Sequence, residues 1–283
     1  MRPLEQDVLR SGLASPSILP ADNILTALIS FIRKTLVITE LEIRKLRHDA
    51  TDLVTRAIQP ALWLLVFGQV FTQFRAIPTG SLRYIDFMAP GILAQSVLFI
   101  AIFYGIAIIW ERDLGILHKF LASPTPRPAL VLGKAISAGV RALSQAVIIY
   151  VLALVLGVQV DWNPLALLGV LFVVFLGAGL FATFSLIIAC VVKTRERFMG
   201  IGQVLTMPLF FASNAIYPIS IMPPWLQFIS HINPLTYEVD ALRDLMLAGG
   251  VSTFGIGLDL GVLVVALAIL VAIGSWLYPK VVI

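Results

Sequence analysis

The chain has 283 residues, of which 59% are hydrophobic and 13% are charged, and its formal net charge is +4. Soluble domains carry about 25% charged residues, so this composition excludes an ordinary soluble protein and favours an integral membrane protein. Apolar runs of span length are present and alternating ten-residue patterns are not, which predicts helices rather than an outer-membrane barrel. The single cysteine, Cys190, permits neither an intramolecular disulfide nor a cysteine-based metal site.

The N-terminal region contains two predicted parts. Residues 1–23 mix charges with prolines and lack the apolar core of a signal peptide, so we expect a flexible cytoplasmic tail. Ile24–Val54 has apolar residues at helical spacing and basic residues on the other sides, which predicts an amphipathic helix in the membrane interface. Glu40 and Arg44 stand at i, i+4 in the favourable order on this helix. The alternative is a helix that packs on another soluble domain.

Six apolar stretches of about 20 residues follow and predict six transmembrane helices. We expect them near residues 57–74, 84–110, 129–158, 165–192, 198–217 and 258–278. With the N-terminus inside, only Arg75, Arg83 and Arg243 lie outside, and 17 of the 20 lysine and arginine residues stay on the inner side. This bias predicts that both termini are cytoplasmic. Residues 24–283 are therefore expected to form a single transmembrane domain.

A charged, proline-rich loop, Trp110–Lys134, separates the second and third spans. Acidic residues favour a helix N-terminus, so Glu111 and Asp113 predict that a short surface helix begins there. Leucines at i, i+3 and i+7 predict one apolar stripe on this helix, made by Leu114, Leu117 and Leu121. Such a stripe requires either the bilayer surface or a partner protein.

The segment from Phe198 to Tyr237 carries no Asp, Glu, Lys or Arg and is interrupted by prolines. It is too long for one span, and we expect the fifth span to end near Tyr217. A short helix beginning around Pro223 and a second one over Leu235–Leu247 are then expected to form a partly re-entrant extracellular hairpin. Backbone of this kind persists at membrane depth only when it packs on protein or lines a cavity.

Three stretches, in this order and spacing, resemble the type-2 ABC transporter permeases, in detail the daunorubicin-resistance-like branch. The first runs from Ile58-Gln59-Pro60 to Gly68 and is followed by Tyr84 to Gly91. The second contains Glu111-Arg112-Asp113-Leu114-Gly115 and Leu132-Gly133-Lys134. The third contains Tyr217-Pro218-Ile219, Pro223-Pro224-Trp225-Leu226 and Asn233-Pro234-Leu235-Thr236-Tyr237. Together they extend over most of the chain from Ile24 to Tyr278.

The resemblance implies a non-enzymatic permease subunit of an ATP-driven exporter in the bacterial inner (plasma) membrane. It implies pairing with itself or a related permease and with two copies of a separate ATP-binding ABC subunit. The first cytoplasmic loop is then the ATPase-coupling segment, with candidate residues Glu111, Arg112, Asp113, Leu114, Leu117 and Leu121. The interfacial helix is a second contact, with candidate residues Glu40, Arg44 and Arg47. Membrane lipids are the other partners, and no nucleic-acid partner is implied.

No cofactor is expected in this chain, and ATP and magnesium are expected on the partner subunit. The only Gly-Lys pair, Gly133-Lys134, lacks the first glycine and the Ser or Thr of a phosphate-binding loop. The three histidines have no metal-ligand spacing, and no metal site is predicted.

Two further groups are candidates for the transport route. The translocation pathway is predicted to use an aromatic stripe on the first span together with two deep amides: Trp63, Phe67, Phe71, Gln95 and Asn214. Lipid or core packing and helix–helix hydrogen bonds are the alternatives for these residues. The hairpin implied by the resemblance closes the outer side, with gate candidates Tyr217, Pro218, Pro223 and Trp225. The substrate class implied is an amphipathic drug-like or lipid-linked compound.

Three other functions stay open at this point. A polysaccharide or lipooligosaccharide export permease has the same architecture. An ion-coupled secondary transporter or channel requires a buried carboxylate and related halves, but no Asp or Glu lies in the middle of a predicted span and no internal repeat is found. A membrane-bound enzyme with Asp240 and Asp244 as a metal-binding pair is disfavoured because Arg243 stands between them. We expect Asp240 and Arg243 to pair on a helix surface instead.

Overall fold

The computed structural model describes residues 24–46, 55, 58–74, 77–80, 82–122, 125–192 and 194–281. The expected tail 1–23 and residues 47–54, which include Arg47, lie outside these ranges. Within the described residues every named element is a helix, and the one β-type pairing is an isolated antiparallel bridge between Val160 and Leu247. The prediction of an all-α protein is confirmed.

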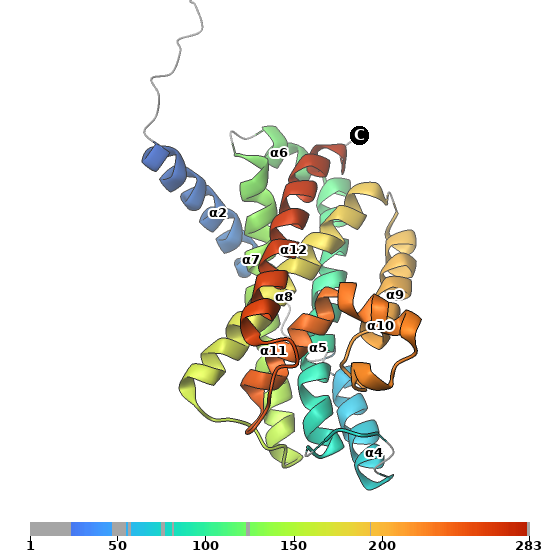
Figure 1. Cartoon of the computed structure of the whole chain (residues 1–283). Coiled ribbons are helices and arrows are strands. Elements are labelled where there is room, and N and C mark those ends of the chain that lie inside the picture. The colour runs from blue at the N-terminus through green and yellow to red at the C-terminus, as the bar shows by residue number, and fades with distance from the viewer. Residues whose placement is uncertain are drawn as a thin grey trace, which may run out of the picture.

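Four helices of the described chain are long and apolar enough to cross a membrane. They are α5 (Tyr84–Asp113), α7 (Arg127–Val155), α8 (Pro164–Val191) and α12 (Ile256–Leu277), and they run alongside one another through the length of the molecule (Figure 1). These helices match the second, third, fourth and sixth predicted spans, with ends that differ by three residues or fewer. Most of α5 is buried, because α7, α8, α9 and α11 all pack against it.

The first and fifth predicted spans have more irregular counterparts. Residues 58–74 contain a π-helical segment, η1 (Trp63–Gly68), followed by α4 (Gln69–Phe74). Helix α9 (Arg195–Phe211) has 17 residues and ends before the expected boundary at Tyr217. It ends because Ser213 turns the chain: its Oγ donates to the Phe210 carbonyl (2.7 Å) and accepts from the Ala215 N–H (3.3 Å). The count of six spans therefore stays a prediction.

The segment between α9 and α12 contains η2 (Ile219–Ile221), α10 (Pro224–Ile232) and α11 (Pro234–Met246). The two helices lie where the prolines predicted them, since each begins with proline in its first turn. Asn233 separates them and accepts from the Leu235 N–H at 3.0 Å, while its amide donates to the Leu209 carbonyl of α9 at 2.7 Å. Pro234 borders an apolar pocket that is also lined by residues from the middle of α8 and α12.

Two hydrophobic cores hold the elements together. The larger core lies among α5, α7, α8 and α11. The smaller core, called the inner core below, lies towards the α6 end of the bundle, where the C-terminus also lies (Figure 1). It collects residues from α2 (Ile24–Leu46), α6 (Ile116–Ala122), η3 (Tyr278–Val281) and four other helices. Its buried members are Ile38, Ile108, Ile109, Leu117, Leu130, Val131, Leu186, Ala189, Phe198 and Tyr278.

Candidate functional site

The connection between α5 and α6 is a tight turn at Leu114–Gly115. Glu111 and Asp113 belong to the last turn of α5, so the prediction that a surface helix begins at Glu111 is wrong. Gly115 has φ +69°, and its N–H bonds to the Arg112 carbonyl at 2.9 Å. This left-handed glycine ends α5 after Asp113, and α6 begins anew at Ile116.

The turn also separates the leucines that were expected to form one stripe. Leu114 is 67% exposed, whereas Leu117 is fully buried in the inner core. The side chain of Leu121 lies outside the described residues. The i, i+3 spacing predicts a shared face only within a continuous helix, and Gly115 interrupts that helix.

The acidic residues of this connection contact other parts of the same chain. Asp113 lies 3.0 Å from Arg112 and 2.9 Å from Arg195 at the start of α9. The Arg195 guanidinium also lies 4.0 Å from the centre of the Trp110 ring, a cation–π contact. These contacts fix the end of α5 to the start of α9.

Glu111 lies inside the molecule, where it joins a group of charged residues from three helices. Lys134 Nζ of α7 lies 2.7 Å from Glu111 Oε2 and 3.1 Å from Glu42 Oε1 of α2. Tyr104 of α5 donates its hydroxyl to Glu42 Oε2 at 2.8 Å. Glu42, Glu111 and Lys134 are each 5% exposed or less. We call these four residues the buried charge cluster.

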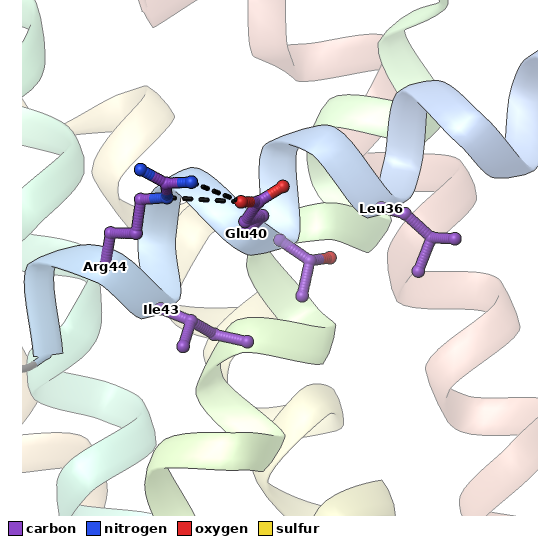
Figure 2. A pocket seen from close by; sticks show the side chains of 5 residues that line it. Leu36, Glu40, Ile43 and Arg44 are labelled. Carbon is purple, nitrogen blue, oxygen red and sulfur yellow. Dashed lines mark hydrogen bonds and ion pairs between the residues drawn. The ribbon is translucent and has the colours of Figure 1, made fainter.

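Next to the side of α2 that carries Glu42, a pocket extends from the buried Thr39 to the exposed side of the helix (Figure 2). The pocket is lined by Leu36, Thr39, Glu40, Ile43 and Arg44. Arg44 reaches back to Glu40 at 2.6 Å, as the i, i+4 spacing predicts, and both side chains are mostly exposed. A pair in this setting contributes about 0–1 kcal/mol, so it leaves both groups available to another molecule.

The aromatic stripe of the first predicted span contacts two aromatic residues of α9. Trp63 stacks on Phe67 at 4.5 Å between ring centres, and Phe67 stacks on Phe71 at 6.1 Å. Phe210 and Phe211 of α9 both meet Trp63 edge-on, each at 6.1 Å. The two amides predicted for the same pathway lie elsewhere, since Gln95 and Asn214 are buried in the interior.

Comparison with known proteins decides the family. Residues 33–247 match the model of the ABC-2 type transporter family. The chain belongs to this family. It is 30% identical over 216 residues to the putative transport permease ycf38 of Cyanophora paradoxa, which covers 75% of this chain and 74% of the relative. It is also 25% identical over 200 residues to a daunorubicin resistance ABC transporter permease protein of Streptomyces coeruleorubidus, covering 71% of this chain and 70% of that protein.

A third relative of this ABC-2 permease is the probable multidrug ABC transporter permease YbhR of Escherichia coli. The identity is 30% over 172 residues, which is 59% of this chain and 45% of the relative. Membership of the family identifies the chain as a transport permease subunit of an ABC transporter. It also implies an ATP-binding ABC subunit as partner.

In this permease, Asp240 of α11 collects hydrogen bonds from the loop before α12. Its Oδ2 accepts from Ser252 Oγ (2.9 Å), Thr253 N (2.6 Å) and Phe254 N (3.0 Å). Its Oδ1 accepts from Thr253 Oγ1 (3.0 Å) and lies 3.7 Å from Arg243. Asp240 and Arg243 form the expected pair, but their expected position on the surface is wrong, because α5, α8 and α12 surround α11 and bury both residues. The arginine also stacks on Phe87 at 3.9 Å.

The start of α5 in this permease is tied to the loop between α7 and α8. Arg83 contacts Asp86 through two hydrogen bonds of 2.8 Å and also donates to the Gly157 carbonyl. Asp86 accepts from the Gln159 N–H at 3.1 Å. Hydrogen bonding to Asp86 raises the pKa of the Arg83 guanidinium above its usual value, so the guanidinium stays charged.

The predicted gate residues lie along the η2–α10 region. Tyr217 donates to the Phe211 carbonyl at 2.6 Å and is half-buried, as is Pro218. Pro223 and Trp225 are exposed. No group of His, Cys, Asp and Glu within the described residues has the arrangement of a metal site.

Sequence reasoning missed the burial of three ionisable residues of the permease, Glu42, Lys134 and Glu238. Glu238 of α11 is fully buried, and neither carboxyl oxygen has a hydrogen-bond partner among the described residues. It packs on Gly177, halfway along α8, where a Cβ would lie 2.3 Å from the Glu238 Cδ. The sequence did contain one signal of this burial in the spacing of charges on α11. Glu238, Asp240 and Arg243 cannot all share one exposed face of a helix, so not all of them can point to solvent.

Proposed function

We propose that this permease is the membrane-spanning subunit of an ATP-driven exporter. Two copies of the chain pair and bind two copies of a separate ATP-binding ABC subunit, which holds the ATP and magnesium. The family match and the relatives named as ABC transporter permeases support this proposal. The cell's inner membrane is the proposed location, with both termini cytoplasmic, because the excess of Lys and Arg then lies inside.

The observation that carries the proposal is the form of the α5–α6 turn. Asp113 and Glu111 bind it to α9 and α7, so it is rigidly attached to the bundle. At the same place Leu114 is 67% exposed, an apolar side chain that another protein can cover. A rigid connection with an exposed apolar tip suits a docking segment that transmits movement. The partner must contact this segment differently in its two states, or ATP cannot bias the equilibrium.

The proposed transport route uses the remaining features of the bundle. Residues 58–74 and α9 serve as the first and fifth of six spans. The α10–α11 hairpin enters the membrane from the outer side, which is supported by the position of Pro234 beside the middle of α8 and α12. The surface of Trp63, Phe67 and Phe71 offers an amphipathic drug-like or lipid-linked substrate a wall of aromatic rings.

The test is co-purification of the ATP-binding subunit with the tagged permease from its native membrane. Leu114→Glu places a charge on the exposed tip without touching the internal ion pairs, and we expect it to lower recovery of the ATPase by about tenfold or more. Val251→Glu is the matched control, because it introduces the same charge at a 74% exposed position on the loop before α12. Equal recovery with both variants contradicts docking at the α5–α6 turn.

A second arm tests the class of transporter. The permease alone, reconstituted in vesicles without ATP, is expected to transport nothing. Transport driven by an ion gradient under these conditions would refute the exporter-subunit proposal. It would favour the ion-coupled alternative, for which Glu238 is the buried carboxyl to examine first.

A further inference from the structure

The buried charge cluster lies where α2, α5 and α7 meet. Lys134 and Glu42 are each 2% exposed and Glu111 is 5% exposed. A charge in such a position is strongly unfavourable unless opposite charges and hydrogen bonds compensate it. The ammonium has carboxylate oxygens at 2.7 and 3.1 Å, one from each neighbouring helix. The cluster therefore fixes the relative position of three helices at one point.

The residue before Lys134 explains how α2 comes close enough to take part. A Cβ on Gly133 would lie 2.6 Å from Ile38 Cγ2, so only glycine permits this approach of α2 to α7. Thr39 donates to the Gly133 carbonyl at 3.3 Å beside the same contact. Glu42 follows Ile38 by one helical turn and so points at Lys134.

The same ammonium binds the last turn of α5, which leads directly into the α5–α6 turn. Around the cluster, the inner core joins these helices through apolar contacts such as those of Ile38, Ile108 and Leu130. Apolar contacts are non-directional and allow helices to slide, whereas a buried ion pair requires a particular distance. The ion pairs of Lys134, together with the hydrogen bond from Tyr104 to Glu42, are therefore the directional contacts that hold α2 and the end of α5 in register.

We infer that Lys134 is a positioning residue that joins α2 and the α5–α6 turn into one mechanical unit. A displacement of the turn by the ATP-binding partner then moves α2 and α7 with it. The part of this inference that concerns the partner rests on the proposed function. The joint, by which we mean the fixed position of α2 relative to the α5–α6 turn, is a property of the permease alone and is tested separately.

The joint is tested by the distance between two spin labels in the purified permease without any partner. The labels are placed at Leu36 on α2 and Leu114 on the turn, both exposed, in a Cys190→Ser background that removes the native thiol. We expect a narrow distance distribution in this background and a broad one after Lys134→Met. Arg127→Met is the matched control, because it removes an exposed positive charge from the first turn of the same helix. A distribution that stays narrow after Lys134→Met overturns the joint.

The coupling role is tested by the amount of substrate transported per ATP hydrolysed in the reconstituted complex. Lys134→Met is expected to lower this ratio by about tenfold or more while ATP hydrolysis continues, since coupling free energies are typically of that size. Arg127→Met is expected to leave the ratio unchanged. A broadened distance with an unchanged ratio overturns the coupling role. Absence of ATP-driven transport in the unmodified complex would refute the proposed function and leave the distance test of the joint valid.

A second variant protects the test against loss of folding. Removing one member of a buried ion cluster leaves the others uncompensated, whereas replacing all members with neutral groups is often tolerated. The triple variant Glu42→Gln, Glu111→Gln, Lys134→Met removes the three charges together. We expect it to fold, to show the broad distance distribution and to lose coupling. A triple variant with a narrow distribution and normal coupling overturns the inference even if the single variant does not accumulate.

Discussion

Replacement of Asp240 with asparagine is expected to destabilise the permease more than any other exchange of one acid for its amide on α11. Four hydrogen bonds of 2.6–3.0 Å end on its two carboxylate oxygens, and the residue is fully buried. Asparagine keeps one oxygen. If that oxygen takes the place of Oδ2, it keeps the N–H groups of Thr253 and Phe254 bonded. The new amide NH₂ then points towards the Asn214 amide and the Arg243 guanidinium, which are donors themselves.

The magnitude follows from the loss of charge. A hydrogen bond to a charged group contributes about 1 kcal/mol more than a neutral one, and four such bonds are weakened. The neutral amide is easier to bury, which offsets part of this loss, so we expect the free energy of unfolding to fall by about 3 kcal/mol. For a protein of this size that corresponds to a decrease in Tm of roughly 6–10 °C.

The assay is thermal unfolding of the detergent-purified permease, with Asp244→Asn as the matched control. Asp244 lies one turn later on α11, is half-buried and accepts from the Ser252 N–H at 3.3 Å. We expect its replacement to cost about 1 kcal/mol or less. Equal shifts in Tm for the two variants would refute the reasoning that Asp240 organises the loop before α12.

Two further predictions concern the contact between α11 and the middle of α8. Gly177→Ala is expected to lower the free energy of unfolding by about 1–3 kcal/mol, because the added methyl group overlaps Glu238. Gly257→Ala is the control, because Gly257 is a helical glycine with no atom within 4 Å of the added Cβ, and it is expected to stabilise the permease or leave its Tm unchanged. A similar decrease in Tm for the two alanine variants would contradict the overlap with Glu238. Glu238→Gln is expected to keep or raise the Tm, because the carboxyl has no partner to lose among the described residues, and a marked decrease would show an unseen partner.

Much of the helical organisation was predictable because its signals are local. Long apolar runs define α7, α8 and α12 to within three residues, and a proline in the first turn marks where α10 and α11 begin. The break at Asn233-Pro234 is equally local, since the asparagine side chain caps the helix that the proline begins. Each of these signals acts within a single turn of the chain.

The candidate site was less predictable because its contacts are distant in sequence. Lys134 meets Glu42 across 92 positions, and no local pattern reports that separation. The expected leucine stripe failed for a local reason, since Gly115 adopts φ +69° and breaks the helical period between Leu114 and Leu117. Helix α11 is enclosed on several sides, so the charges on it did not reveal which side faces the core.

The pair of Arg83 and Asp86 has a consequence for how the chain enters a membrane. The two residues are three positions apart, so their ion pair of 2.8 Å forms as soon as the first turn of α5 exists. In the proposed orientation this end of α5 crosses the bilayer during biogenesis, and a locally neutralised acid crosses at lower cost than a free carboxylate. Gln159 is synthesised much later, and its N–H then binds the same carboxylate. One side chain thus first eases the insertion of α5 and afterwards fastens the α7–α8 loop to it.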